Sequence, residues 1–120
     1  MKNHKELKEE YKNKKFKMGV FQIKNKINSK IFIGSSLNLD AIWNRHKTQL
    51  KIGMHPNKAL QADWKQYGED SFSYEILAEL KEEPDKDVDT NKEVKLLEQL
   101  YIEELEPFGD RGYNKRPVNK

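Results

Sequence analysis

The stretch MGVFQIKNKINSKIFIGS, residues 18–35, decides the fold. Its two ends, Met18–Lys24 and Lys30–Ser35, are rich in β-branched and aromatic residues, which favour strands. The short connection between them holds two asparagines, a residue type that tolerates a positive φ. Two such runs joined by a short polar connection predict a β-hairpin, in which Phe21 and Ile23 share one face of the first strand.

The rest of the chain predicts three core helices and one further strand. Apolar residues recur at helical spacing after two candidate N-caps, Asn38 and Asn57, and again before Pro107. The resulting order ββααβα predicts an α+β fold, with a small three-stranded sheet and about three helices packed on it. The expected elements are a helix over 39–51, a helix over 58–67, a strand over 72–77 and a helix over 94–105.

Three segments are expected to lie outside this core. Residues 1–17 are predicted to form a basic N-terminal arm with a marginal helix, which either touches phosphate or frays. The charged run over 81–91 contains a proline and is expected to be a solvated loop. Residues 115–120 are expected to be a flexible tail, which leaves one domain over 18–114.

The composition excludes several classes of protein. The 120 residues contain no cysteine, so disulfide frameworks, thiolate zinc sites and cysteine nucleophiles are ruled out. No apolar run approaches the roughly 20 residues that a membrane-spanning helix needs. A soluble, cytoplasmic protein with no membrane association is therefore expected.

Charge is distributed unevenly along the chain. Residues 1–68 carry 15 Lys and Arg against 5 Asp and Glu, whereas residues 69–106 carry 4 against 14. Such segregation predicts a basic face suited to a polyanion and an acidic face turned away from it. The alternative is that the opposite charges neutralise one another across the fold.

Six ordered blocks of sequence resemble the GIY-YIG nuclease superfamily, and most closely its phage homing endonuclease branch. The resemblance extends over residues 18 to about 114 and implies a nuclease fold. It also implies a nucleic acid, DNA in particular, as the partner and Mg²⁺ as the bound metal. The blocks are GVFQIKNKINSKIFIGSSLNL, WNRH, GMHPNKALQ, WKQYG, FSYEIL and GYN.

The resemblance also implies an active site, which this chain keeps only in part. The two signature tyrosines fall on Phe21 and Phe32, and the helix arginine falls on Ile42. A phenyl ring keeps the packing of a tyrosine but can neither bind nor pass a proton. The family's remaining positions fall on matching residue types: His46, a further histidine His55, the asparagine Asn114 and the metal-binding glutamate Glu98.

Substitute groups for the missing chemistry lie nearby in the sequence. Arg45, three residues after Ile42, and Lys24, at the end of the first strand, are candidate cations. His46 is a candidate base, because the ordinary pKa of histidine lies near neutrality. For Arg45 the alternative is a solvated residue on the helix surface.

Each retained residue also has a structural alternative. His46 would be a hydrogen-bonded core histidine, and Glu98 would either snorkel at the edge of its apolar stripe or be bonded to Tyr101 or Tyr113. Asn114 would close a turn, and His55 would be an exposed loop residue. The aromatic residues Trp43, Trp64, Phe72 and Tyr74 are expected to pack in the core rather than to stack on bases.

Three functions follow from these observations. The first is a GIY-YIG domain that binds nucleic acid with a weakened or inactive phosphodiesterase site. The second is an active Mg²⁺-dependent DNA endonuclease that uses substitute residues. The third is a protein-interaction module whose working surface is the acidic segment over 69–106. Basic residues gathered beside Phe21 and Phe32 would favour nucleic acid, and scattered ones would favour the third function.

Overall fold

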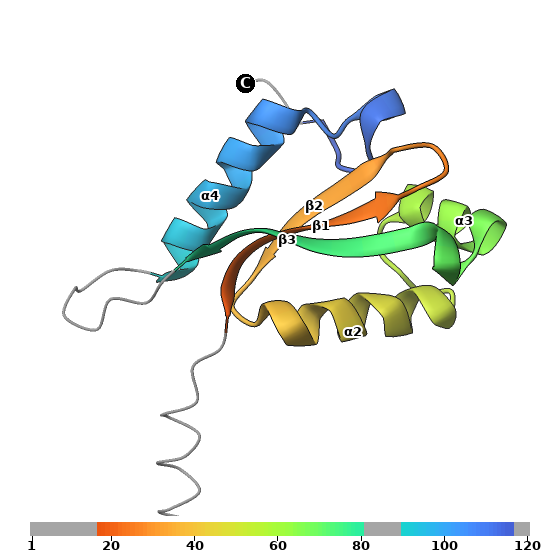
Figure 1. The fold of residues 1–120 in the computed structure, drawn as a ribbon, viewed down its shortest axis with the longest axis horizontal. Helices are drawn as coiled ribbons and strands as arrows, with labels where there is room; N and C mark the ends of the chain where they lie inside the picture. Colours follow the sequence, from red (N-terminus) through yellow and green to blue (C-terminus); the bar gives the residue numbers. More distant parts are fainter. Residues whose placement is uncertain (1–16, 81–89, 117–120) are drawn as a thin grey trace, which may run out of the picture.

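The computed structural model describes residues 17–80 and 90–116. Three strands form one antiparallel sheet in the order β2-β1-β3, with helices on both of its faces (Figure 1). The predicted α+β class and the order ββααβα are confirmed. The elements are β1 (Met18–Asn25), β2 (Ile31–Ser36), α2 (Leu39–Lys51), α3 (Lys58–Tyr67), a 3-10 turn (Glu69–Ser71), β3 (Phe72–Leu80), α4 (Thr90–Leu105) and a second 3-10 turn (Gly109–Arg111).

Parts of three predictions lie outside the described residues. These are the helix of the N-terminal arm, most of the charged loop and the end of the C-terminal tail. The missing ranges are 1–16, 81–89 and 117–120. Within the described ranges, no helix combines the length and the apolar character needed to cross a membrane.

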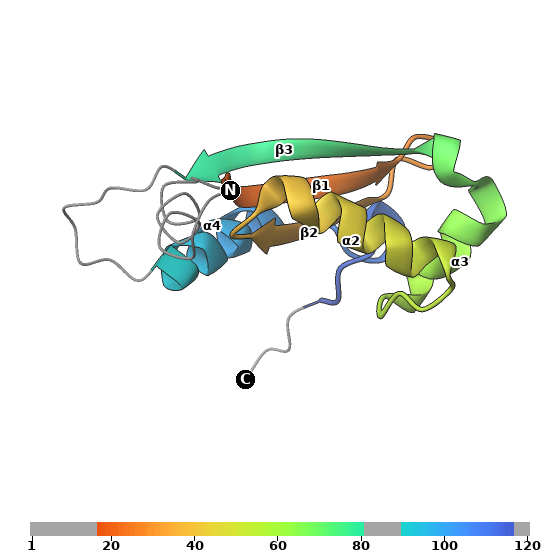
Figure 2. The ribbon, with the colours of Figure 1, turned by 90° about the horizontal axis from the view of Figure 1, so that it is seen from below.

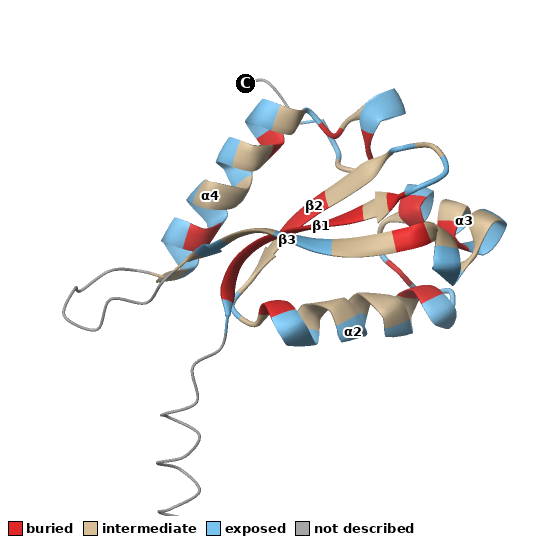
Figure 3. Ribbon diagram, in the orientation of Figure 1, coloured by how far each residue is buried: buried red, intermediate tan, exposed pale blue. Residues whose placement is uncertain are grey.

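The central strand β1 is buried along nearly its whole length, because it has a strand on each side and helices on both faces (Figure 3). Val20 belongs to the core beneath α4, whereas Phe21 and Ile23 belong to the core beneath α2 and α3. The helices α2 and α4 accordingly lie on opposite faces of the sheet (Figures 1 and 2). We call the two sides the α2/α3 face and the α4 face.

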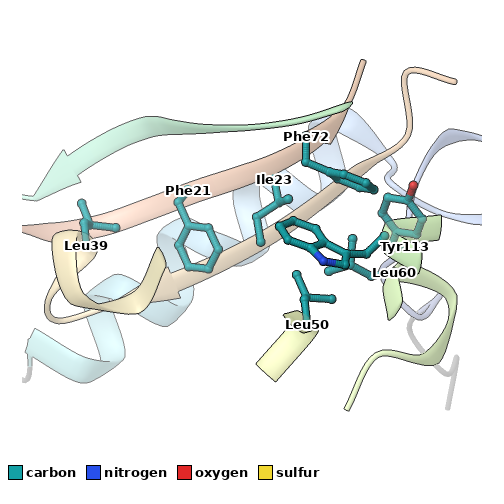
Figure 4. Close-up of a cluster of buried hydrophobic side chains, with 8 residues drawn as sticks. Phe21, Ile23, Leu39, Leu50, Leu60, Phe72 and Tyr113 are labelled. Carbon is teal, nitrogen blue, oxygen red and sulfur yellow. The ribbon is translucent and has the colours of Figure 1, made fainter. Parts of the chain in front are cut away.

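The larger core lies on the α2/α3 face (Figure 4). Trp43 and Tyr74 pack against it as a stacked pair, with ring centroids 5.1 Å apart and an interplanar angle of 9°. Trp64 and Phe72 are buried in the same core, so the prediction that these four aromatic residues pack in the core is confirmed. The buried side chains of this core are Phe21, Ile23, Leu39, Leu50, Leu60, Trp64, Phe72 and Tyr113.

The hairpin forms as predicted, but its connection uses different chemistry. Ser29 takes the positive φ, at 66°. The side-chain oxygens of Asn25 and Asn28 instead accept hydrogen bonds from the backbone N–H groups of Ile27 and Lys30. Asparagine stabilises a turn by this local bond as readily as by a left-handed backbone, and here it does so while Ser29 takes the left-handed conformation.

Two element boundaries also differ from the prediction. β3 continues three residues beyond 77, to Leu80, past an irregularity in its pairing with β1 between Val20 and Phe21. The irregularity lets the strand bend and continue. α4 begins at Thr90, inside the range predicted as a loop, so the polar residues Thr90 and Asn91 form its first turn.

The C-terminal segment seals the outer edge of β2. The Tyr113 N–H donates to the carbonyl oxygen of Ile31 at 2.9 Å. The side-chain amide of Asn114 accepts from the Ile33 N–H and donates to the Ile33 carbonyl, each at 2.8 Å. Gly112 bridges to Ile31, and a Cβ there would lie 2.5 Å from the Ile31 oxygen, so only glycine fits. The segment thus satisfies backbone groups that an edge strand otherwise exposes.

Candidate active site

Four rings from four parts of the chain meet on the α2/α3 face. Phe21 from β1 and Phe32 from β2 have ring centroids 6.5 Å apart. His46 from α2 lies 5.5 Å from Phe21 and 5.7 Å from Phe32. His55, from the connection between α2 and α3, lies 6.2 Å from Phe32. We call Phe21, Phe32, His46 and His55 the aromatic–histidine cluster.

Gly34 makes room for this cluster. Phe21 is only 1% exposed, and its ring occupies the space that a side chain at Gly34 would need. A Cβ at Gly34 would lie 2.6 Å from Cζ of Phe21. Since the two residues are cross-strand partners, the bare backbone of Gly34 fixes where the Phe21 ring lies.

The two histidines form a hydrogen-bonded pair with a defined direction. The Asn57 backbone N–H donates to Nδ1 of His55 at 3.0 Å, so the neutral His55 ring carries its proton on Nε2. That Nε2 lies 2.7 Å from Nδ1 of His46 and donates to it. The lone pair of His46 Nδ1 is therefore occupied, and the remaining nitrogen, Nε2, carries the proton of His46.

Both histidines are neutral at pH 7. Burial, together with the charges of His55 and Arg45, lowers the pKa of His46 to about 4. Burial also lowers the pKa of His55 below its usual value. The near-neutral pKa that a general base needs is therefore absent from His46. His55 is only 6% exposed, so the alternative of an exposed loop histidine is wrong.

Two polar residues hold His55 in place, Asn57 through its backbone N–H and Gln61 through its side chain, and the sequence assigned neither to the site. Gln61 accepts from the His55 N–H at 3.1 Å and donates to the Leu50 carbonyl at 3.0 Å. Asn57, predicted only as a helix cap, caps α3 through the Leu60 N–H and also donates to the Tyr113 carbonyl at 2.7 Å. No spacing rule signals such contacts, because they join three segments that are separate in the sequence.

The substitute cations lie in different places. Arg45 is exposed on α2, close enough to His46 for its charge to lower the pKa of that histidine. Lys24 alternates with Phe21 and Ile23 along β1 and so belongs to the opposite, α4 face. Ile42 is half-buried against the larger core. The structure thus brings Arg45, but not Lys24, beside the aromatic–histidine cluster.

Glu98 lies on α4, the helix that covers the other face of the sheet from the four rings. Its side chain is 14% exposed, and its carboxylate lies 3.5 Å from Nζ of Lys95. Tyr101 and Tyr113 donate instead to the Leu77 carbonyl and to Asp63, so the alternative of a bond from either tyrosine to Glu98 is wrong.

Asn114 has a structural role in addition to its family position. Both atoms of its amide bond the backbone of Ile33, so it secures the edge of β2 rather than closing a turn. Its position next to Tyr113 also places it near Asn57 and thus near the support of His55.

Charge differs between the two faces. The helices α2 and α3 carry five Lys or Arg and two Asp, a net charge of +3. The helix α4 carries two Lys and four Glu, a net charge of −2. The basic helices are those that flank the aromatic–histidine cluster.

A comparison with protein families decides the ancestry of this arrangement. The model of the GIY-YIG catalytic domain matches residues 17–114. This chain belongs to the GIY-YIG family. The matched range includes both strands of the hairpin, with Phe21 and Phe32, and the helix α2, with His46. It ends at Asn114.

Relatives of known identity agree with this assignment. The chain is 36% identical over 69 residues to Intron-associated endonuclease 1 of Enterobacteria phage T4; the match covers 58% of this chain but only 28% of that protein. The fold matches the catalytic domain of the homing endonuclease I-TevI, with a TM-score of 0.66, 30% identity, and coverage of 83% of this chain and 99% of that one. A mutant of the same catalytic domain matches with a TM-score of 0.69, 30% identity, and coverage of 82% and 93%.

Proposed function

We propose that this GIY-YIG domain binds DNA through its α2/α3 face and cleaves phosphodiesters weakly or not at all. One observation carries the proposal: both signature rings, Phe21 and Phe32, lack a hydroxyl and pack against a histidine whose accepting nitrogen is already occupied. The basic charge of α2 and α3 supports a polyanion on this side.

Hydrolysis of a phosphodiester needs a base for the attacking water and a cation for the charge that develops on phosphate. The phenyl rings supply no base, and Ile42, at the arginine position, supplies no charge. His46 could take a proton at Nε2 only if the bonds through His55 to Asn57 were rearranged. Since one such group commonly contributes about a hundredfold to rate, a large loss of activity is expected.

Glu98 is the residue that would hold Mg²⁺. Among residues 17–80 and 90–116, no three His, Asp or Glu side chains lie together as a metal site, so the protein would provide one carboxylate. One carboxylate fits Mg²⁺, which keeps several waters and binds substrate phosphate. Because Glu98 lies on α4, on the other face of the sheet from the aromatic–histidine cluster, a Mg²⁺ held there would offset charge only on a phosphate that reaches α4.

The exposed position of Arg45 beside His46 favours a second candidate, an active Mg²⁺-dependent endonuclease with a relocated cation. Incubation of the protein with DNA and Mg²⁺ or Mn²⁺ distinguishes this candidate from the weak or inactive nuclease. We expect the natural sequence to cleave slowly or not at all, and Phe21→Tyr with Phe32→Tyr and Ile42→Arg to raise the rate by about a hundredfold or more.

Two controls accompany this experiment. Glu98→Ala tests whether any cleavage belongs to the protein, because a contaminating nuclease would be unaffected. Phe32→Tyr alone avoids the crowding between Phe21 and Gly34 and should fold normally. Rapid cleavage by the natural sequence that Glu98→Ala abolishes would establish the active enzyme. Absence of salt-sensitive binding to duplex, branched and single-stranded DNA would instead leave the protein-interaction module.

A further inference from the structure

The connection between α2 and α3 presents two large apolar side chains to solvent. Ile52 is 62% exposed and Met54 is 73% exposed. They flank Gly53, and the residue that follows Met54 is the buried His55 of the aromatic–histidine cluster. We call Ile52–Gly53–Met54 the apolar tip; it projects beside the candidate active site.

Backbone hydrogen bonds hold the apolar tip in a fixed shape. The Ile52 N–H donates to Thr48 at 3.1 Å, and the Met54 N–H donates to Gln49 at 2.9 Å. Gly53 adopts a left-handed φ of 77°, which ends the helix and turns the chain outward. The tip is thus anchored to the last turn of α2, so its exposed side chains need little ordering before they contact a partner.

The surroundings of the apolar tip are basic. Lys58 is exposed on the first turn of α3, and Arg45 is exposed on α2. Lys51, which precedes the tip, pairs with Glu69 at 3.4 Å, so part of the local charge is neutralised. The net charge of α2 and α3 nevertheless stays at +3. Exposed apolar side chains within a basic surface fit DNA, whose phosphates attract the charges and whose stacked bases accept the apolar groups.

We propose that Ile52 and Met54 insert as a wedge between base pairs of duplex DNA held on the α2/α3 face. This inference rests on the proposed function and specifies its mode of binding. Insertion unstacks a base step at a cost of about a few kcal/mol and bends the duplex. Because pyrimidine–purine steps unstack most easily, the preferred partner is a duplex with TA or CA steps.

The test uses a duplex of about 30 base pairs with TA steps, labelled with 2-aminopurine at one step and with dyes at its ends. Binding is followed by anisotropy, unstacking by 2-aminopurine fluorescence and bending by energy transfer. We expect Ile52→Ser with Met54→Ser to abolish both distortion signals and to weaken binding about tenfold. The matched control, Leu96→Ser with Leu100→Ser, removes two similarly exposed side chains (63% and 53%) from α4 and should behave like the natural sequence.

A second variant separates insertion from charge. Ile52→Lys with Met54→Lys adds two positive charges, so it should bind at least as tightly as the serine variant and yet leave the duplex undistorted. Equal distortion by the natural sequence and the serine variant would overturn the wedge. Tight, salt-dependent binding without distortion by any protein would also overturn it and would leave the proposed function standing. If no protein bound the duplex, the wedge would fail, and the proposed function would fail with it only if branched and single-stranded DNA also stayed unbound.

Discussion

At the residue scale, His46 and His55 act as one unit whose proton arrangement is set by a backbone group. The Asn57 N–H fixes the tautomer of His55, and His55 fixes that of His46. The Nε2–H group of neutral His46 is consequently a hydrogen-bond donor. It can bond a phosphate oxygen, but it cannot take a proton from water.

Acid should destabilise the protein through His46. Its folded pKa of about 4 lies below the ordinary value of 6.5, so between these values the unfolded chain binds a proton that the folded chain does not. The free energy of unfolding is therefore expected to fall as the pH drops from 6.5 toward 4. Urea unfolding at several pH values, compared with His46→Gln, checks this: the variant should show a shallower fall. Parallel curves for the two proteins would contradict it.

The positions of the candidate residues were predictable, but their partners were not. The resemblance assigned His46, His55 and Glu98 from short blocks of sequence. The direct bond between the histidines depends on how the α2–α3 connection folds, and Gln61 and Asn57 control that connection through contacts across the chain. Burial of His55, and with it the low pKa values, could not be inferred from the pattern GMHP, which is typical of an exposed turn.

At the element scale, local patterns predicted the existence of every strand and core helix, because each carries a strong apolar periodicity and a clear cap or breaker. They failed where tertiary contacts extend an element. β3 gains Ala78, Glu79 and Leu80 by pairing with β1 past an irregularity, and no feature of those three residues alone requires it. The 3-10 turn Gly109–Arg111 and the sealed edge of β2 likewise depend on contacts far along the chain.

The two helix caps are expected to differ in strength. Asn38 caps α2 through the Ala41 N–H alone, at an exposed site. Asn57 caps α3 and also satisfies the Tyr113 carbonyl. Asn38→Ala should lower the free energy of unfolding by about 1 kcal/mol. Asn57→Ala should lower it by about 2–3 kcal/mol, since it also leaves a carbonyl without its donor.

Chemical denaturation of both variants measures this difference, with Asn38→Ala as the matched control. Equal losses would show that the bond from Asn57 to the C-terminal segment contributes nothing to stability. Nuclear magnetic resonance of the histidines in Asn57→Ala adds a second readout, because movement of the α2–α3 connection should alter the signals of both His46 and His55.

At the scale of the whole molecule, the helices on the two faces of the sheet differ in charge, at +3 for α2 and α3 together and −2 for α4. The sequence showed that charge changes sign along the chain, and the topology converts this into a difference between faces, because α2 and α3 cover one side and α4 covers the other. The charges of the described helices favour a polyanion-binding face over mutual neutralisation, a choice that the sequence alone leaves open.

DNA binding should therefore depend on which face loses charge. Arg45→Gln with Lys58→Gln removes two positive charges from the α2/α3 face, and Lys92→Gln with Lys95→Gln removes two from α4. The first pair should reduce the slope of log affinity against log salt by about 1–2, if each residue contacts a phosphate. The second pair should leave it nearly unchanged. Anisotropy titrations without divalent metal measure both, and equal reductions would rule out a single DNA-binding face.

The two hydrogen bonds between the Asn114 amide and the Ile33 backbone limit where this domain can be truncated or fused. A fragment cut after α4 would keep all its helices and strands yet leave one flank of β2 open to pairing with another molecule. Such a fragment is a candidate for edge-to-edge association of β2 strands and for fibril growth. Fusion partners attached on this side should therefore follow the asparagine and not the last helix.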